Sequence, residues 1–145
     1  MRIILVLSFL LVPTLALADD LPAMRGGMWE FVRKAPTDPV NNPGKLSTMD
    51  KKECVKDMKA HFEKQKAMLS KMCKFSETKK SRNTYTTVST CDMPQMQAKY
   101  TNKNVTTVKG DSAYESRIDT EGTAAGKPVK WTETVTARRI GDCGK

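Results

Sequence analysis

Residues 73–91, CKFSETKKSRNTYTTVSTC, decide the fold because they predict a β-hairpin that a disulfide closes. The middle of the stretch, residues 81–83, is polar and turn-forming, and residues 85–88 are typical of a strand. A hairpin with its turn at this point places Cys73 directly opposite Cys91. The two cysteines are then close enough to bridge if they form a non-hydrogen-bonded pair.

Two further cysteines, Cys54 and Cys143, complete an even set of four. No Cys-x-x-Cys spacing is present and His61 is the only histidine, so disulfides are expected rather than a metal or redox site. Four cysteines allow three pairings, and the hairpin favours the one that joins Cys73 to Cys91 and Cys54 to Cys143. We expect the two bridges to stabilise the fold by about 3–5 kcal/mol each.

The first 18 residues, MRIILVLSFLLVPTLALA, have the pattern of a secretory signal peptide. Arg2 supplies a short positive region, residues 3–11 are apolar, and Ala16-Leu17-Ala18 is a small-x-small cleavage site. The apolar run is shorter than the roughly 20 residues of a spanning helix, which disfavours an uncleaved anchor. We therefore expect cleavage after Ala18, a single domain over residues 19–145, and a soluble protein in the periplasm or outside the cell, with no later membrane span.

The composition predicts a small, basic domain with a poor hydrophobic core. The chain has 145 residues and a formal net charge of +9. Only 16 Leu, Ile, Val and Phe residues follow residue 18, which by itself would favour disorder, whereas the four cysteines favour a stapled fold. These numbers exclude a multidomain enzyme, a polytopic membrane protein and a large apolar core.

The remaining chain favours antiparallel strands. We expect strands over residues 28–34, 74–80, 84–91, 99–109, 113–120 and 129–138. The strand at 99–109 shows no clean alternation, which predicts a bulge or a position at a sheet edge. Residues 35–44 and 121–128 are rich in proline and glycine and are expected to form loops.

One long helix is expected from Met49 to Met72. Ser47 or Thr48 can cap its start, and its apolar residues recur at three- and four-residue spacing. The expected apolar stripe consists of Val55, Met58, Phe62, Leu69 and Met72. The predicted fold is therefore α+β: a curved, mostly antiparallel meander with one long helix packed on it and two disulfides.

Several short motifs occur in a fixed order along the chain. They are Gly27-Met28-Trp29-Glu30, Cys54, Cys73, Cys91, Gly110-Asp111-Ser112-Ala113-Tyr114 and Arg138-Arg139-Ile140-Gly141-Asp142-Cys143. In these motifs the chain resembles the bacterial exported family known as domain of unknown function 3617. The resemblance implies a periplasmic or secreted location and a mostly antiparallel β domain. It implies no activity and supplies no catalytic residues.

Basic residues concentrate between residues 51 and 82, which suggests contact with an anionic surface. The candidate residues on the expected helix are Lys52, Lys56, Lys59 and Lys66. An exported protein without interleaved aromatic residues is a poor candidate for nucleic acid binding, so lipid headgroups, lipopolysaccharide or cell-wall polymers are the expected partners. The alternative is a solvated helix face whose charge serves solubility.

A second hypothesis places a small apolar ligand inside the curved sheet near Trp29 and Trp131. A third is a copper site built from thioethers, with Met93, Met96 and His61 as candidates. Methionine is also a common filler of small cores, and this reading is the stronger one. We predict no metal or other cofactor, and the oligomeric state stays open.

Two carboxylates follow tryptophan or lie on an apolar strand face. Glu30 follows Trp29, and Glu133 lies between Trp131 and Val135 on the expected inner face of the last strand. A carboxylate in an apolar setting can act as an acid or base, whereas an ion pair with a nearby Arg or Lys is the simpler explanation. No phosphate loop, nucleophile elbow or HExxH motif is present. We therefore predict a non-enzymatic binding or structural component of the cell envelope.

Overall fold

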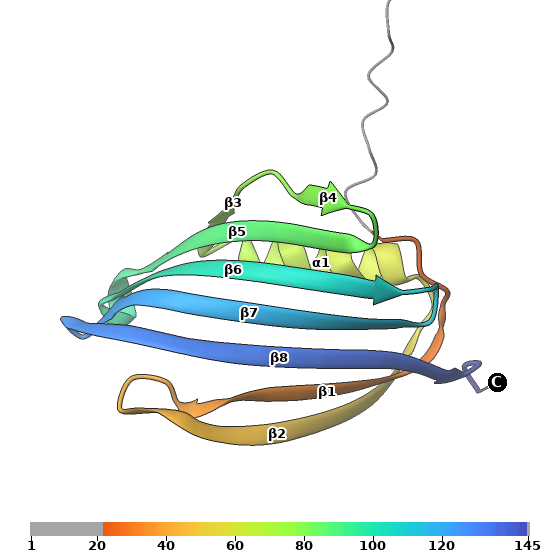
Figure 1. Cartoon of the computed structure of the whole chain (residues 1–145), viewed down its shortest axis with the longest axis horizontal. Coiled ribbons are helices and arrows are strands. Elements are labelled where there is room, and N and C mark those ends of the chain that lie inside the picture. Colours follow the sequence, from red (N-terminus) through yellow and green to blue (C-terminus); the bar gives the residue numbers. More distant parts are fainter. Residues whose placement is uncertain (1–21, 145) are drawn as a thin grey trace, which may run out of the picture.

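A computed structural model describes residues 22–144, which form eight strands, one α-helix and one short 3-10 turn. The elements are β1 (Gly27–Asp38), β2 (Asn42–Val55), α1 (Met58–Leu69), β3 (Cys73–Phe75), β4 (Lys79–Ser81), β5 (Thr84–Met93), η1 (Pro94–Met96), β6 (Ala98–Lys109), β7 (Ala113–Ala124) and β8 (Lys127–Gly141) (Figure 1). The expected signal peptide, residues 1–18, lies outside the described residues. Within residues 22–144, no helix has the length and apolar composition needed to cross a membrane.

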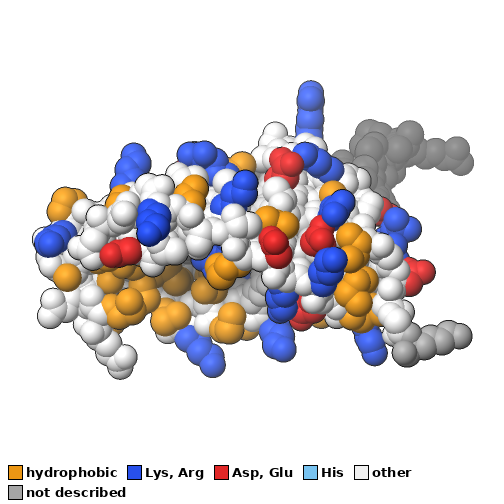
Figure 2. Space-filling view, turned by 90° about the horizontal axis from the view of Figure 1, so that it is seen from below, with side chains coloured by type: hydrophobic (Ala, Val, Ile, Leu, Met, Phe, Trp, Pro, Cys, Tyr) orange, Lys and Arg blue, Asp and Glu red, His pale blue; other side chains and the backbone are white. Residues whose placement is uncertain are grey.

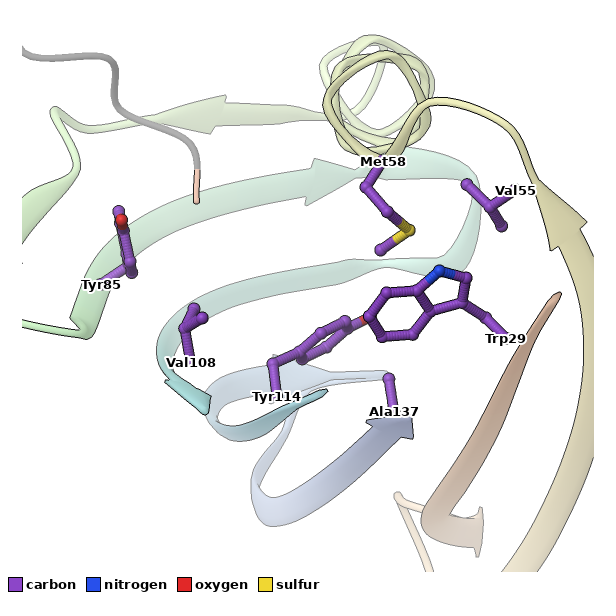
Figure 3. Close-up of a cluster of buried hydrophobic side chains, with 7 residues drawn as sticks. All are labelled: Trp29, Val55, Met58, Tyr85, Val108, Tyr114 and Ala137. Atoms are coloured by element: carbon purple, nitrogen blue, oxygen red, sulfur yellow. The ribbon is translucent and has the colours of Figure 1, made fainter. Parts of the chain in front are cut away.

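All strands belong to one antiparallel sheet in the order β2-β1-β8-β7-β6-β5-β3, and β4 also pairs with β5. Strands β5 to β8 form a meander, and β1 then lies beside β8, so the first and last strands of the chain are neighbours. The sheet is curved and unclosed, and α1 lies against its concave side (Figures 1 and 3). The prediction of a curved antiparallel sheet with one helix is confirmed.

The hairpin over residues 73–91 has the predicted register at its cysteine end, but near the turn the pairing is shifted by one residue, with Lys79 opposite Thr86 and Ser81 opposite Thr84. Cys73 pairs with Cys91 and Phe75 with Ser89. The first strand of the hairpin is also divided into β3 and β4, since residues 76–78 lie outside the regular ladder, although the Ser76 N–H donates to the Val88 carbonyl at 2.8 Å. Both expected disulfides are present: the Cα atoms are 3.9 Å apart in Cys73–Cys91 and 5.4 Å apart in Cys54–Cys143. Two disulfides indicate an extracellular or otherwise oxidising compartment.

The expected helix over 49–72 is too long. Residues 49–55 belong instead to β2, which pairs along its length with β1, from Gly27 opposite Val55 to Asp38 opposite Asn42. The edge strand β2 is exposed over most of its length, so its sequence lacks the alternation that marks a half-buried strand. The helix begins only after Asp57, whose carboxylate accepts a hydrogen bond from the Ala60 N–H at 3.1 Å.

The two expected loops, 35–44 and 121–128, are mostly strand. The pairing of β1 with β8 ends at Lys34 opposite Thr134, so beyond this point each strand has only one neighbour. Pro36 and Pro128 both lie in these one-sided segments, where a missing N–H breaks no ladder hydrogen bond on the open side. The loop prediction from proline content is therefore wrong, because strand segments with a single neighbour tolerate proline.

The expectation of a bulge or an edge at residues 99–109 is also wrong. Strand β6 lies inside the sheet and pairs without a shift with both β5 and β7. Its inward positions carry polar side chains that bond to one another across the strands. Thr106 contacts Ser116 at 2.6 Å, and the Thr120 hydroxyl donates to Asn102 at 2.7 Å. Hydrogen bonding replaces apolar burial here, which removes the alternation from the sequence.

Two apolar clusters lie on the concave side. The larger one sits beneath α1 and consists of Trp29, Val55, Met58, Tyr85, Val108, Tyr114 and Ala137. Figure 3 shows Met58 pointing from α1 toward Trp29 and Tyr114. The smaller one consists of Ala98, Ala124 and Val129, with Val40, Met93, Tyr100 and Trp131 packed against it.

Candidate functional site

A pocket of about 770 Å³ lies between the concave side of the sheet and the first turns of α1. We call it the sheet–helix pocket. Its apolar lining consists of Phe31, Met49, Phe62, Tyr114, Ile118 and Val135. Its polar lining consists of Arg33, Asp50, Lys51, Glu53, His61, Gln65 and Ser116. Figure 2 shows hydrophobic side chains gathered on one half of this face of the molecule, with Lys and Arg projecting around them.

Strand register places the apolar lining on one face. Phe31 on β1 stands opposite Ala137 on β8, and Val135 stands opposite Ser116 on β7. Because side chains alternate along a strand, these residues point to the same side of the sheet. The helix supplies Phe62, whose ring meets that of Tyr114 edge-on with centroids 5.6 Å apart. With β2, which supplies Met49, five elements build one pocket.

Tyr114 lies at the inner end of this lining and is nearly fully buried. Burial raises the pKa of its hydroxyl to about 12, because the phenolate would lose its hydration. The tyrosine is thus neutral at physiological pH and presents an aromatic face with a neutral hydroxyl.

The polar lining is electrically balanced. Arg33 and Lys51 supply two cations, Asp50 and Glu53 two carboxylates, and Lys51 lies 2.5 Å from Glu53. The hydrogen bond from Lys51 holds the pKa of Glu53 below its usual value. His61 lies at this rim.

The imidazole of His61 is held by two contacts. Its ring stacks on Phe31 at a centroid distance of 5.8 Å, and its Nε2 lies 2.8 Å from the Gln65 side-chain nitrogen. The rim therefore offers polar groups without an excess of either charge.

A family model described as "Protein of unknown function (DUF3617)" matches residues 24–143. The chain belongs to this family. No curated protein and no solved structure matches the chain.

The structure brings together the two end motifs of this DUF3617 protein. Glu30 of the first motif pairs in register with Arg138 of the last, and their side chains meet at 2.6 Å. The Arg139 Nε donates to the Gly26 carbonyl at 2.8 Å. The Cys54–Cys143 disulfide closes the same corner. These motif residues hold the first and last strands together, which gives them a structural role.

Both candidate carboxylates of the DUF3617 chain are engaged in ion pairs. Hydrogen bonding by Arg138 lowers the pKa of Glu30, and its side chain lies 3.7 Å from Lys52. This is the opposite of the raised pKa that an acid catalyst needs. Glu133 accepts from the Arg33 Nε at 3.0 Å and from the Trp131 indole at 3.0 Å. The ion-pair alternative describes both residues.

The two tryptophans proposed as ligand contacts lie in different clusters. Trp29 has 0% exposed surface and is packed under Met58, so it does not line the pocket. Its indole N–H donates to the Arg25 carbonyl at 3.1 Å. Trp131 packs in the smaller cluster, with its ring centroid 5.2 Å from that of Tyr100. The structure therefore moves the candidate apolar site to the region between Phe31, Phe62 and Val135.

The four candidate lysines do not share a helix face, because α1 begins at Met58. Lys52 lies on β2 beside Glu30, and Lys56 precedes the helix. Lys59 and Lys66 are on α1, and Lys66 lies 5.8 Å from the ring of Phe75.

The three copper candidates are also separated. Met93 packs in the smaller cluster, Met96 is exposed on η1, and His61 stacks on Phe31 at the pocket. Over residues 22–144, no group of three or more His, Cys, Asp and Glu side chains is placed to hold a metal ion.

Sequence reasoning missed most of the pocket. Of its apolar lining, Val135 lies on a strand face expected from the sequence, and Phe62 lies on the expected helix stripe. The sequence did not indicate where the helix starts, because the edge strand β2 lacks the alternation of apolar and polar residues that marks a strand. The Asp57–Ala60 cap is the signal that could have located it.

Proposed function

We propose that this DUF3617 protein is exported and binds a small amphipathic molecule in the sheet–helix pocket without catalysing a reaction. The observation that carries the proposal is the pocket itself: about 770 Å³, with a lining surface that is mostly apolar. This volume is within the range of about 300–1,000 Å³ that is usual for small-molecule sites. Export rests on the signal-peptide pattern of residues 1–18 and agrees with the two disulfides.

The residues that line the pocket indicate the chemistry of the ligand. Phe31, Phe62, Ile118 and Val135 favour an apolar body such as a single acyl chain. Both cations of the lining are paired with carboxylates, Lys51 with Glu53 and Arg33 with Glu133, so the polar end of the ligand is expected to be neutral or zwitterionic. A monoacylglycerol fits this description, and a free fatty acid fits it less well.

Two disulfides support a pre-formed site. Cys54 precedes α1 and is tied to Cys143, and Cys73 follows α1 and is tied to Cys91. The helix that forms one wall is thus fixed to the sheet near both of its ends. A wall that is already in place reduces the ordering cost of binding.

The isoleucine methyl groups provide a direct test. After residue 18 the chain contains only two isoleucines, Ile118 in the pocket and Ile140 on the exposed end of β8. Monopalmitoylglycerol should shift the Ile118 methyl signal in an NMR titration and leave that of Ile140 in place. Two unshifted signals, or two equal shifts, would contradict the proposal.

A matched pair of variants tests the same site through affinity. Val135→Phe fills the pocket, whereas Val105→Phe adds the same bulk to the opposite face of the sheet. We expect Val135→Phe to weaken binding of N-phenyl-1-naphthylamine by about tenfold or more and Val105→Phe to leave it unchanged. Thermal unfolding of both variants checks that the fold is kept.

A further inference from the structure

Positive charge is concentrated on one short part of the chain. Residues 56–82, which we call the lysine-rich segment, contain nine basic and three acidic side chains. The excess of six positive charges compares with a formal net charge of +9 for the entire chain. On the convex face of the sheet, Arg138 is paired with Glu30 and Arg117 with Asp119.

Three large hydrophobic side chains are exposed within this segment. Met68 is 61% exposed, Leu69 43% and Met72 49%. We call them the apolar tip. They lie in the last turn of α1 and directly after it, and Lys64, Lys66, Lys71 and Lys74 surround them in sequence. Exposed apolar side chains rimmed by cations are typical of a surface that meets a membrane.

The helix α1 is attached to the sheet through its first turn, which explains why its C-terminal end is exposed. Met58, in the first turn, is its only buried residue. Leu69 at the other end also lines a smaller cavity of about 170 Å³, together with Phe75 and Tyr85. This cavity and the sheet–helix pocket share Phe62 and Gln65. The apolar tip therefore lies beside a cavity that adjoins the proposed ligand site.

We propose that the apolar tip and the lysines around it dock the protein onto an anionic phospholipid bilayer. The negative surface potential of such a bilayer attracts the lysines, and the tip adds burial in the headgroup region. A soluble polyanion would satisfy the lysines but would leave Met68, Leu69 and Met72 in water. The presence of the tip thus favours a bilayer as the partner.

Vesicle flotation tests the electrostatic part of the proposal. The protein from residue 19 onward should float with mixed phosphatidylcholine–phosphatidylglycerol vesicles, dissociate as salt rises, and ignore pure phosphatidylcholine. Replacing Lys64, Lys66, Lys71 and Lys74 with Gln should weaken binding by a factor between about ten and a thousand. The matched control replaces Lys99, Lys103, Lys127 and Lys130 with Gln, which removes the same charge elsewhere. Equal losses in both variants would overturn a localised docking surface.

Serine substitutions test the apolar part. The variant Met68→Ser, Leu69→Ser, Met72→Ser should lose vesicle binding, whereas Leu46→Ser, Met96→Ser, Ile140→Ser changes three other exposed hydrophobic residues and should keep it. Full vesicle binding by the tip variant would overturn the proposal, and equally tight binding of wild type to heparin would then identify a polyanion as the partner. The Ile118 titration needs no vesicles, so failure of docking and failure of the pocket are distinguishable.

Discussion

At the scale of single residues, the first family motif depends on a glycine. Gly27 has a φ of +147°, and a Cβ added there would lie 2.4 Å from the Arg139 Nε and 2.5 Å from the Gly141 carbonyl oxygen. Residues with a side chain rarely adopt this backbone conformation, and the Gly141 carbonyl oxygen, as part of the backbone, cannot move away to make room. The close approach of β1 and the end of β8 therefore requires glycine at this position.

Gly27→Ala should lower the free energy of unfolding by about 2–4 kcal/mol, through backbone strain and overpacking. Gly44→Ala is the matched control, because a Cβ there meets nothing within 4 Å. We expect the control to change stability by less than about 0.5 kcal/mol. Urea unfolding of both variants measures the difference, and equal effects would show that the corner tolerates a side chain.

At the scale of elements, the helix is held to the sheet by its first turn. Met58 is fully buried over Trp29, whereas Met68, three turns later, is mostly exposed. Met58→Ala should therefore cost about 2–4 kcal/mol through the lost contacts and the cavity left behind. Met68→Ala makes the same chemical change and should cost less than about 0.5 kcal/mol. Chemical unfolding compares them, and similar costs would mean that α1 packs along its whole length.

The strands were predictable where one face is buried and the other is wet. Residues 129–138 alternate and residues 84–91 are rich in strand-forming side chains, and both were assigned correctly, as was the pairing of Cys73 with Cys91. Strand β2 was misassigned because both of its faces are largely exposed, so nothing constrains its pattern. Its residues are compatible with a helix, and pairing with β1 overrides that local preference.

The candidate site was predictable only in part, for a related reason. The inward face of β8 was recognised from its alternation, and Val135 lies on it. Trp29 was expected at a ligand, yet Met58 covers it once the helix starts nine residues later than predicted. A single element boundary thus decides which aromatic residues form the core and which line the pocket.

At the scale of the whole molecule, the buried apolar core is small, and the disulfides compensate for it. The two clusters contain mostly small or medium side chains, with only Trp29 and Met58 large and fully buried. The disulfides close loops of very different length, with sequence separations of 89 for Cys54–Cys143 and 18 for Cys73–Cys91. Loop-closure entropy predicts that the longer loop stabilises more.

Replacing Cys54 and Cys143 together with Ser should lower the free energy of unfolding by about 4.6 kcal/mol. The same change at Cys73 and Cys91 should cost about 3.2 kcal/mol, since the shorter loop restricts the unfolded chain less. Urea unfolding of the two double variants gives the comparison, and a reducing agent should abolish the difference between either variant and wild type. A larger loss at Cys73–Cys91 would mean that local packing of the hairpin, rather than chain entropy, is what that bridge protects.

The pocket adds a second readout, because the Cys54–Cys143 bridge fixes the strand that leads into α1. Loss of the Cys54–Cys143 bridge should therefore weaken ligand binding in the absence of denaturant, where the variant is still folded.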